Sequence, residues 1–362
     1  MFLANTTSGI GYLWYLIFLA IGVVLLVKGA DFFVGGASSV AKKFKIPSII
    51  IGLTVVSFGT SAPELAVSLT ASIKGESGIA LGNVVGSNII NLLIVLGFSS
   101  VITPITVKKS LVKREFPFLL ATTLLLIIFS LDNLFMGFNG IENILSRGEA
   151  LIFIFGIIAF CYISIIIAKK DAQKEALDFS TYDGEIQKPA EEDEIKELPI
   201  WKTALLLVLG LAGIIVGAEF VTTPATVIAT SLGVAAGLDL EMVVNVVGLT
   251  VVALGTSLPE LVTSIIAAKK GENEIAIGNV VGSNIFNILF ICGMSGIIIP
   301  LTMSSDIITD MFISLAATVL VFVFCKKGKI TRKNGLIFLL VYSIYLAYIL
   351  TRLFVPSLAI PF

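Results

Sequence analysis

A stretch of 47 residues occurs twice in this chain, at residues 52–98 and 248–294. The two copies align without a gap at a constant offset of 196 residues, and 29 of the 47 positions are identical. The identities include Gly, Thr, Ser, Pro, Glu, Lys and Asn, so a shared apolar composition cannot produce them. The repeat predicts a fold of two related halves, each built around one copy.

Both halves are predicted to cross a membrane. Hydrophobic residues make up 57% of the chain and charged residues only 14%, against about a quarter charged in a typical soluble domain. Several apolar segments run for about 20 residues, which is enough to cross a hydrocarbon core of roughly 30 Å. The predicted spans are 12–34, 46–72, 78–103, 115–131, 148–168, 201–221, 239–267, 275–300, 306–325 and 334–354.

The number of spans in each half fixes how the halves are related. Each half holds five, an odd number, so the second half enters the membrane from the opposite side. The predicted fold is therefore an all-α polytopic membrane protein with about ten transmembrane helices in two inverted five-helix repeats. We assign residues 1–168 to the first repeat, 169–199 to an acidic linker and 200–362 to the second repeat.

The charged loops predict the orientation in the membrane. Cytoplasmic loops are enriched in Lys and Arg. If the N-terminus is outside, the outside loops hold only Lys74, Arg147 and Arg352, and all other loop lysines and arginines fall inside. Both termini are thus expected to be extracytoplasmic, with the linker cytoplasmic, in the plasma membrane of a prokaryotic cell.

Composition excludes several functions. A net charge of −1 gives no support for a nucleic-acid partner. The chain has no histidine, which removes imidazole metal ligands and histidine proton relays. Cys161, Cys292 and Cys325 lie far apart in apolar segments, so they are expected in the core rather than in disulfides. No cofactor and no enzymatic activity are expected.

Each repeat carries an interruption that a lipid-facing helix would not keep. The sequences are "GTSAPE" at 59–64 and "GTSLPE" at 255–260. Each fits the S-x-x-E capping box of a helix start, with proline in the first turn, so spans 2 and 7 are predicted to be broken helices. A carboxylate at this depth costs several kcal/mol unless it has a partner or lines a wet cavity. No basic residue is near, so Glu64 and Glu260 are predicted to bind cations.

The second part of the repeat supplies neutral oxygens. In "GNVVGSNIIN", Asn83, Ser87 and Asn91 are spaced by four and share one helical face. Gly82 and Gly86 predict a close helix contact. The ligands predicted from the two copies of this motif are Ser87, Asn91, Ser283 and Asn287. Asn88 and Asn284 lie off that face and are interpreted as polar contacts between helices.

These groups form a site made only of oxygen ligands. Calcium takes six to eight such ligands, and sodium also binds hydroxyl and carbonyl oxygens. The absence of imidazole and of paired thiolates argues against zinc or copper. The residues therefore predict a site for a hard cation, for which Ca²⁺ and Na⁺ are candidates.

The paired "GTSAPE" and "GTSLPE", followed by "GNVVGSNIIN" and "GNVVGSNIFN", resemble the α-repeats of the sodium/calcium exchangers, within the calcium/cation antiporter superfamily. The resemblance implies ion sites between spans 2, 3, 7 and 8, and alternating access in which spans 1 and 6 slide across this core. It implies Glu64 and Glu260 as the central ligands. It implies hydroxyl ligands at Thr60, Ser61, Ser87, Thr256, Ser257 and Ser283, and backbone carbonyl ligands at Ser57 and Ala253.

One position departs from part of that family. Some members are acidic where this chain has Asn91 and Asn287. Two carboxylates balance one Ca²⁺, whereas three Na⁺ would leave a charge of +1, so a 3:1 exchange would be electrogenic. The missing acid weakens potassium-dependent and proton-coupled exchange, which stay open as alternatives. A cation channel and a membrane scaffold are less favoured by inverted repeats with buried glutamates. The sequence does not predict the oligomeric state.

Overall fold

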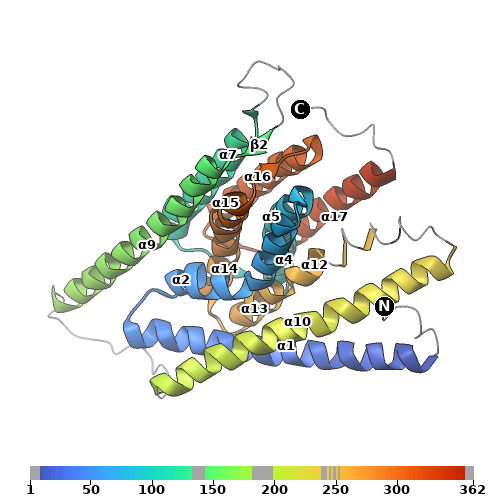
Figure 1. The fold of residues 1–362 in the computed structure, drawn as a ribbon. Coiled ribbons are helices and arrows are strands. Elements are labelled where there is room, and N and C mark those ends of the chain that lie inside the picture. The colour runs from blue at the N-terminus through green and yellow to red at the C-terminus, as the bar shows by residue number, and fades with distance from the viewer. Residues whose placement is uncertain are drawn as a thin grey trace.

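The computed structural model describes residues 9–132, 143–181, 199–237, 243, 246–247, 250–251 and 253–354. These residues are almost entirely helical (Figure 1). The first half contains α1 (Gly9–Phe44), α2 (Ser48–Ile51), η1 (Gly52–Val56), α3 (Ser57–Thr60), α4 (Ala62–Ile73), α5 (Ser77–Ile90), η2 (Asn91–Val95), α6 (Leu96–Ile102), η3 (Leu111–Glu115), α7 (Phe116–Phe129) and α9 (Arg147–Thr181). The second half contains α10 (Ile200–Ala235), α12 (Ala253–Thr256), α13 (Leu258–Lys269), α14 (Asn273–Phe286), η5 (Asn287–Cys292), α15 (Gly293–Ile298), α16 (Ser305–Cys325) and α17 (Arg332–Phe354).

The helices agree with an all-α membrane protein. Among the described residues, seven helices are long and apolar enough to span a membrane, and the bent pair Ser48–Thr60 and Ala62–Ile73 adds an eighth. The predicted span 115–131 corresponds to η3 and α7, and the predicted span 239–267 lies partly outside the described residues. Helix α9 continues to Thr181, beyond the predicted end at 168. Its extension "KKDAQKEAL" is rich in strong helix formers, which explains the additional turns.

Span 2 is broken where the sequence predicts. Its two parts meet at Ser61 with a bend of 49°, and Pro63 stands in the first turn of α4. The π-helical segment η1 precedes the break, and η2 and η5 begin at Asn91 and Asn287, the last polar residues of the repeated motif. Such π-segments are concentrated at functional sites because they turn side chains and carbonyls away from the regular helix.

Two short strand pairs reveal the inverted relation of the halves. Strand β1 (Ile105–Thr106) pairs with β4 (Lys329–Ile330), and β2 (Ile144–Leu145) pairs with β3 (Leu301–Thr302). Strands β1 and β3 follow equivalent spans of the two repeats, 196 residues apart. Each pair therefore joins the two repeats, and the two pairs are equivalent under the exchange of one repeat for the other.

Helices α1 and α10 form a closely packed pair that crosses beside the other helices (Figure 1). A Cβ atom at Gly22 would lie 2.9 Å from the carbonyl oxygen of Gly217, and one at Gly29 would lie 2.8 Å from that of Gly210. The absence of side chains at these positions lets the two backbones touch, as in small-residue contacts between transmembrane helices. We refer to these two helices as the α1–α10 pair.

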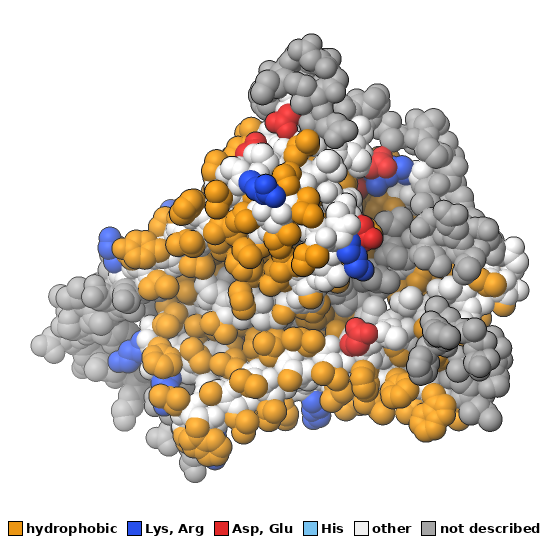
Figure 2. All heavy atoms as spheres, in the orientation of Figure 1, with side chains coloured by type: hydrophobic (Ala, Val, Ile, Leu, Met, Phe, Trp, Pro, Cys, Tyr) orange, Lys and Arg blue, Asp and Glu red, His pale blue; other side chains and the backbone are white. Residues whose placement is uncertain are grey.

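The outer surface is apolar. Figure 2 shows hydrophobic side chains over most of the visible face, with few charged ones. The exposed hydrophobic side chains of the protein include Trp14 of α1, Phe155 of α9 and Val208 of α10, which are 56%, 67% and 64% exposed. Large exposed apolar surfaces of this extent are stable only against lipid or a partner, which agrees with a protein embedded in a membrane.

Candidate cation-binding site

The two repeated glutamates lie at the restarts of the broken helices. Glu64 is in the first turn of α4 and Glu260 is in the first turn of α13. Both side chains are completely buried. Among the described residues, no lysine or arginine forms an ion pair with either of them. The site therefore holds two buried carboxylates without a basic partner.

Serines from the opposite repeat reach each carboxylate. The Ser61 hydroxyl donates to Glu260 Oε1 at 2.8 Å, and the Ser257 hydroxyl donates to Glu64 Oε1 at 3.3 Å. Ser283 of α14 also donates to Glu260 Oε1, at 3.3 Å. These exchanged bonds bring the two carboxylates and the two helix breaks together at the interface of the repeats.

The same bonds correct the capping-box interpretation. Ser61 and Ser257 do stand at the N-caps of α4 and α13, with proline in the first turn of each helix. Neither serine side chain, however, makes a capping hydrogen bond. The hydroxyls donate to the glutamates of the other repeat instead. Hydrogen bonds to a carboxylate are stronger than those between neutral groups, which favours these partners.

Each carboxylate keeps one oxygen without a hydrogen-bond partner. These atoms are Glu64 Oε2 and Glu260 Oε2, and both are inaccessible to solvent. The side chain of Asn91 and the Oδ1 atom of Asn287 are also buried without a partner. Buried polar atoms are nearly always satisfied in folded proteins, so the two unpaired carboxylate oxygens are candidates for binding a cation.

A layer of amides joins α5 to the second repeat. Asn287 Nδ2 donates to Ser87 Oγ at 2.9 Å and to Asn88 Oδ1 at 3.1 Å. Asn88 Nδ2 contacts the Asn284 carbonyl at 3.5 Å. Asn88 thus lies between helices, as the sequence indicated, while Asn284 bonds within its own helix to the Val280 carbonyl at 2.8 Å.

Two asparagines that were not counted among the ligands support the backbone at the site. Asn83 donates to the Glu64 carbonyl at 3.1 Å and to Ser68 at 2.9 Å. Asn279 makes the equivalent bonds to the Glu260 carbonyl at 3.4 Å and to Ser264 at 3.0 Å. The sequence could have indicated these bonds, because Ser68 and Ser264 each follow the glutamate of their helix by four residues and lie on the same helical face.

The remaining predicted ligands lie close to the breaks. Thr60 donates to Asn279 Oδ1 at 3.0 Å, and Thr256 donates to the Ala253 carbonyl at 3.2 Å. The Ser57 carbonyl accepts the Ser61 backbone N–H at 3.0 Å, so it is bonded within the helix in this structure. Their role as ligands stays a prediction.

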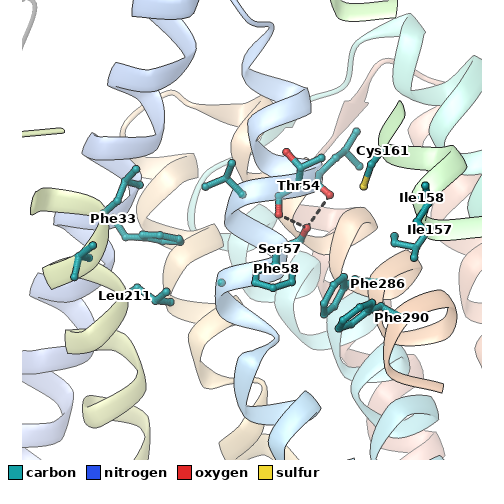
Figure 3. Close-up of a pocket in the computed structure, with 15 residues that line it drawn as sticks. Phe33, Thr54, Ser57, Phe58, Ile157, Ile158, Cys161, Leu211, Phe286 and Phe290 are labelled. Atoms are coloured by element: carbon teal, nitrogen blue, oxygen red, sulfur yellow. Dashed lines mark hydrogen bonds between the residues drawn. The ribbon is translucent and has the colours of Figure 1, made fainter. Parts of the chain in front are cut away.

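A large apolar cavity lies apart from the carboxylates, and neither Glu64 nor Glu260 lines it. It measures about 710 Å³ and is lined mainly by apolar side chains from α1, α9, α10, α14, η5 and the first part of span 2. Figure 3 shows Phe33 and Leu211 on one side of the segment that carries Ser57, and Phe286 and Phe290 on the other. The Ser57 hydroxyl is turned into its own helix, toward the Leu53 and Thr54 carbonyls. This cavity offers no charged group for a cation.

The described residues contain no cluster of three or more histidine, cysteine, aspartate or glutamate side chains. An ion held here would be coordinated by two carboxylates together with hydroxyl and amide oxygens. That donor set suits hard cations such as Ca²⁺ and Na⁺. Inverted repeats, discontinuous helices and a buried polar site at their interface together define a secondary membrane transporter.

Comparison with known proteins identifies the transporter family to which this chain belongs. The family described as "Sodium/calcium exchanger protein" matches residues 14–166 and 202–351. The sodium/calcium exchanger MaX1 of Methanosarcina acetivorans is 34% identical over 348 residues, which cover 91% of this chain and 96% of MaX1. The inner membrane protein YrbG of Escherichia coli is 36% identical over 284 residues, covering 78% of this chain and 79% of YrbG.

The fold agrees with this match. A structure of the sodium-calcium exchanger NCX_Mj, soaked with Na⁺ and Sr²⁺, superimposes with a TM-score of 0.74 at 30% identity, covering 93% of this chain and 99% of that one. The chain belongs to the sodium/calcium exchanger family, and it is an integral multi-pass membrane protein. Both expectations drawn from the repeat, the family and the all-α inverted fold, are confirmed.

Proposed function

We propose that this protein exchanges Na⁺ for Ca²⁺ across the membrane by alternating access, with both ions binding between Glu64 and Glu260. The observation that carries the proposal is the pair of buried carboxylate oxygens without a partner, one from each repeat. Two uncompensated carboxylates are costly to bury. A bound cation relieves that cost, and an empty site therefore resists the conformational change, which favours exchange over leak.

Charge supports an electrogenic cycle. The two carboxylates match one Ca²⁺, and three Na⁺ in the same site would carry one additional positive charge. Asn91 and Asn287 are neutral and buried, so they supply an amide oxygen but no counter-charge for a further cation. We therefore propose about three Na⁺ for each Ca²⁺.

The ligand set is proposed to extend from the glutamates to neighbouring oxygens of both repeats. These are Thr60, Ser61, Ser87 and Asn91 of the first repeat, Thr256, Ser257, Ser283 and Asn287 of the second, and the carbonyls of Ser57 and Ala253. Sodium and calcium would compete for these oxygens, which couples their transport.

We also propose the orientation predicted from the loops, in a prokaryotic plasma membrane. The contacts between loops support it, since the β1–β4 pair and the ion pair of Lys108 with Glu274 gather predicted inside loops at one end. Both termini would be extracytoplasmic and the linker at 169–199 cytoplasmic, between repeats at 1–168 and 200–362. Labelling of single cysteines introduced at Lys108 and at Arg147 in intact cells tests this, since only the second should react with an impermeant reagent.

The deciding experiment is calcium flux into proteoliposomes with Na⁺, K⁺ and H⁺ gradients varied separately. We expect saturable uptake that requires an outward Na⁺ gradient and responds to membrane potential. Uptake driven by a proton gradient alone, or dependent on K⁺, would instead assign the chain to one of those coupling types. Calcium uptake indifferent to all three gradients would refute exchange.

A further inference from the structure

One loop of the second repeat is bonded to the α1–α10 pair. The Lys270 ammonium, at the end of α13, forms an ion pair with Asp31 Oδ1 of α1 at 2.8 Å and donates to the Asp31 carbonyl at 2.7 Å. Two residues further on, Glu272 accepts a hydrogen bond from the Ser38 hydroxyl of α1. We call these contacts the Lys270 latch.

The other repeat carries the same chemistry. The offset of 196 residues makes Lys74 the equivalent of Lys270, and Glu76 the equivalent of Glu272. Aligning "GADFFV" of α1 with "GAEFVT" of α10 makes Glu219 the equivalent of Asp31. This alignment of α1 with α10 has an offset of 188 residues, which makes Thr226 the equivalent of Ser38. Each group of the Lys270 latch thus has a counterpart of the same charge or the same hydroxyl type.

The counterpart contacts are not made in this structure. Lys74, Glu76 and Glu219 are exposed, and within the described part of the chain none of them has an ion-pair partner. Glu219 instead accepts a hydrogen bond from Thr223 on its own helix, at 2.5 Å. Helix α1 packs along α13, whereas the equivalent helices α10 and α4 have no comparable packing among the described residues. One latch is closed and the equivalent set of residues is open.

The α1–α10 pair is built to move as one body. Its four glycines bring the two backbones into contact, and neither helix could shift alone without opening that contact. Its contact with the core is less complete, because the 710 Å³ cavity lies between Phe33 of α1, Leu211 of α10 and the segment around Phe58 (Figure 3). A rigid pair beside an incompletely filled interface can take a second position on the core.

We propose that Lys270–Asp31 with Glu272–Ser38, and Lys74–Glu219 with Glu76–Thr226, are two alternating latches that hold the α1–α10 pair in the two opposite-facing states. The inference rests on the proposed alternating access. Because the repeats are inverted, the two latches lie at opposite ends of the core. In the proposed topology the closed latch is the cytoplasmic one, so the state described here is closed on the cytoplasmic side. Moving the pair breaks one set of bonds and forms the other, and these residues position the pair without touching the transported ions.

Paired cysteines in the full-length protein test the alternation. In a background with Cys161, Cys292 and Cys325 replaced by alanine, one variant carries Asp31→Cys with Lys270→Cys, and a second carries Lys74→Cys with Glu219→Cys. A short bifunctional maleimide is applied while the Na⁺ and Ca²⁺ concentrations on the two sides are varied. We expect each pair to cross-link, with the yield of one rising under conditions that lower the yield of the other, and each cross-link to stop transport.

Single substitutions measure how much the latch contributes. Lys270→Gln should raise the cross-linking yield of the Lys74–Glu219 cysteine pair by roughly twofold to fivefold, the range for the loss of one exposed ion pair. Lys269→Gln removes the same charge one residue away, on a side chain without an ion-pair partner among the described residues, and should change nothing. The exchanged variant Asp31→Lys with Lys270→Asp should restore the original yield.

Two outcomes would overturn the proposal. One is that the Lys74–Glu219 cysteine pair never cross-links under any ion condition, although the protein transports. The other is that both pairs cross-link with yields that do not respond to the ions. The cross-linking readout does not depend on Na⁺ being the coupling ion, so a proton- or potassium-coupled protein could still confirm the latches while refuting the proposed exchange.

Discussion

Helices α5 and α14 share the sequence "GNVVGSN", yet the fold places them in different surroundings. From Ile275 to Phe286, every residue of α14 is buried. On α5, Ile79, the equivalent of Ile275, is 55% exposed. Among the residues that the structure describes, the two equivalent helices are therefore packed differently, with α14 covered where Ile79 of α5 is exposed.

The glycines of the motif show the same difference. A Cβ atom at Gly282 would lie 2.7 Å from Leu53 Cα, and one at Gly278 would lie 2.9 Å from the Ile49 carbonyl oxygen. At Gly82 and Gly86 no atom of the described residues lies within 4 Å of such a Cβ. The predicted close contact at Gly82 and Gly86 is thus absent among the described residues and is found at the equivalent positions of the second repeat. Of the segment equivalent to the partner of α14, residues 245–253, the structure describes 246–247, 250–251 and 253.

The largest effect is expected from Gly282→Leu. The new side chain would overlap the backbone of span 2, and overpacking against backbone should cost about 3 kcal/mol or more of stability. The measurement is the yield of monodisperse protein and its melting temperature in detergent. Gly86→Leu is the matched variant and should keep a near-normal melting temperature. Equal loss in both variants would show that the two helices are packed alike.

The next effect concerns transport, where the two repeats should behave alike. Glu64→Gln and Glu260→Gln each remove one of two charges facing the proposed ion. Loss of one partner of a buried ionic contact costs about 3 kcal/mol, or roughly 100-fold in calcium transport. Each variant should remain folded, because glutamine fills the same volume. Glu149→Gln, on the exposed start of α9, is the control and should transport normally. Normal calcium flux in either of these two variants would show that the ion does not bind between Glu64 and Glu260.

The third prediction compares how fast cysteines introduced on α5 and α14 react with a reagent in solution. Ile79→Cys and Ile275→Cys are equivalent positions, of which the first is 55% exposed and the second fully buried. A water-soluble maleimide should therefore modify Ile79→Cys at least about tenfold faster, since thiol reactivity requires access. Conditions that drive the protein into the opposite state should narrow the ratio. A ratio near one in every condition would contradict the asymmetry of α5 and α14.

The smallest effect is expected at the serines that cross between repeats. Ser61→Ala removes a 2.8 Å bond to Glu260, and Ser257→Ala removes a 3.3 Å bond to Glu64. A hydrogen bond to a charged group contributes about 1.5–3 kcal/mol, and less when it is long. Calcium affinity, measured by titration calorimetry, should fall more for Ser61→Ala. The reverse order would mean that Ser257 is the closer ligand of the bound ion.

Several features of the site were predictable because they are local. The start of α4 after Ser61 could be predicted from the sequence, because proline at Pro63 is typical of the first turn of a helix. The burial of Glu64 and Glu260 followed from their depth in apolar spans. The partner of the Ser61 hydroxyl was not predictable in this way, because the choice between its own helix and Glu260 depends on where the other repeat lies.

Other features depended on distant packing. Asn83 and Asn279 make the same local bonds, but Asn279 also accepts the Thr60 hydroxyl of the opposite repeat, whereas the equivalent Thr256 hydroxyl donates to the Ala253 carbonyl in the described part of the chain. Helix propensity alone would have predicted that α9 continues beyond residue 168. The predicted span ended there because charged residues begin at 169, whereas the helix continues to Thr181. Propensity prevailed there because charged helix formers extend a helix readily once it has left the membrane.

The amino-acid sequence by itself determined that this chain is a membrane protein of two inverted repeats, because span length, apolar content and repeat offset are properties of the chain alone. It also predicted a set of oxygens that could bind a cation. Only the tertiary structure decided that Ser61 bonds to Glu260 and Ser257 to Glu64, and that the α1–α10 pair rests on Lys270 rather than on Lys74. Nearly equivalent residues compete for those contacts, and the choice between them is made by the packing of the whole molecule, which no local sequence can encode.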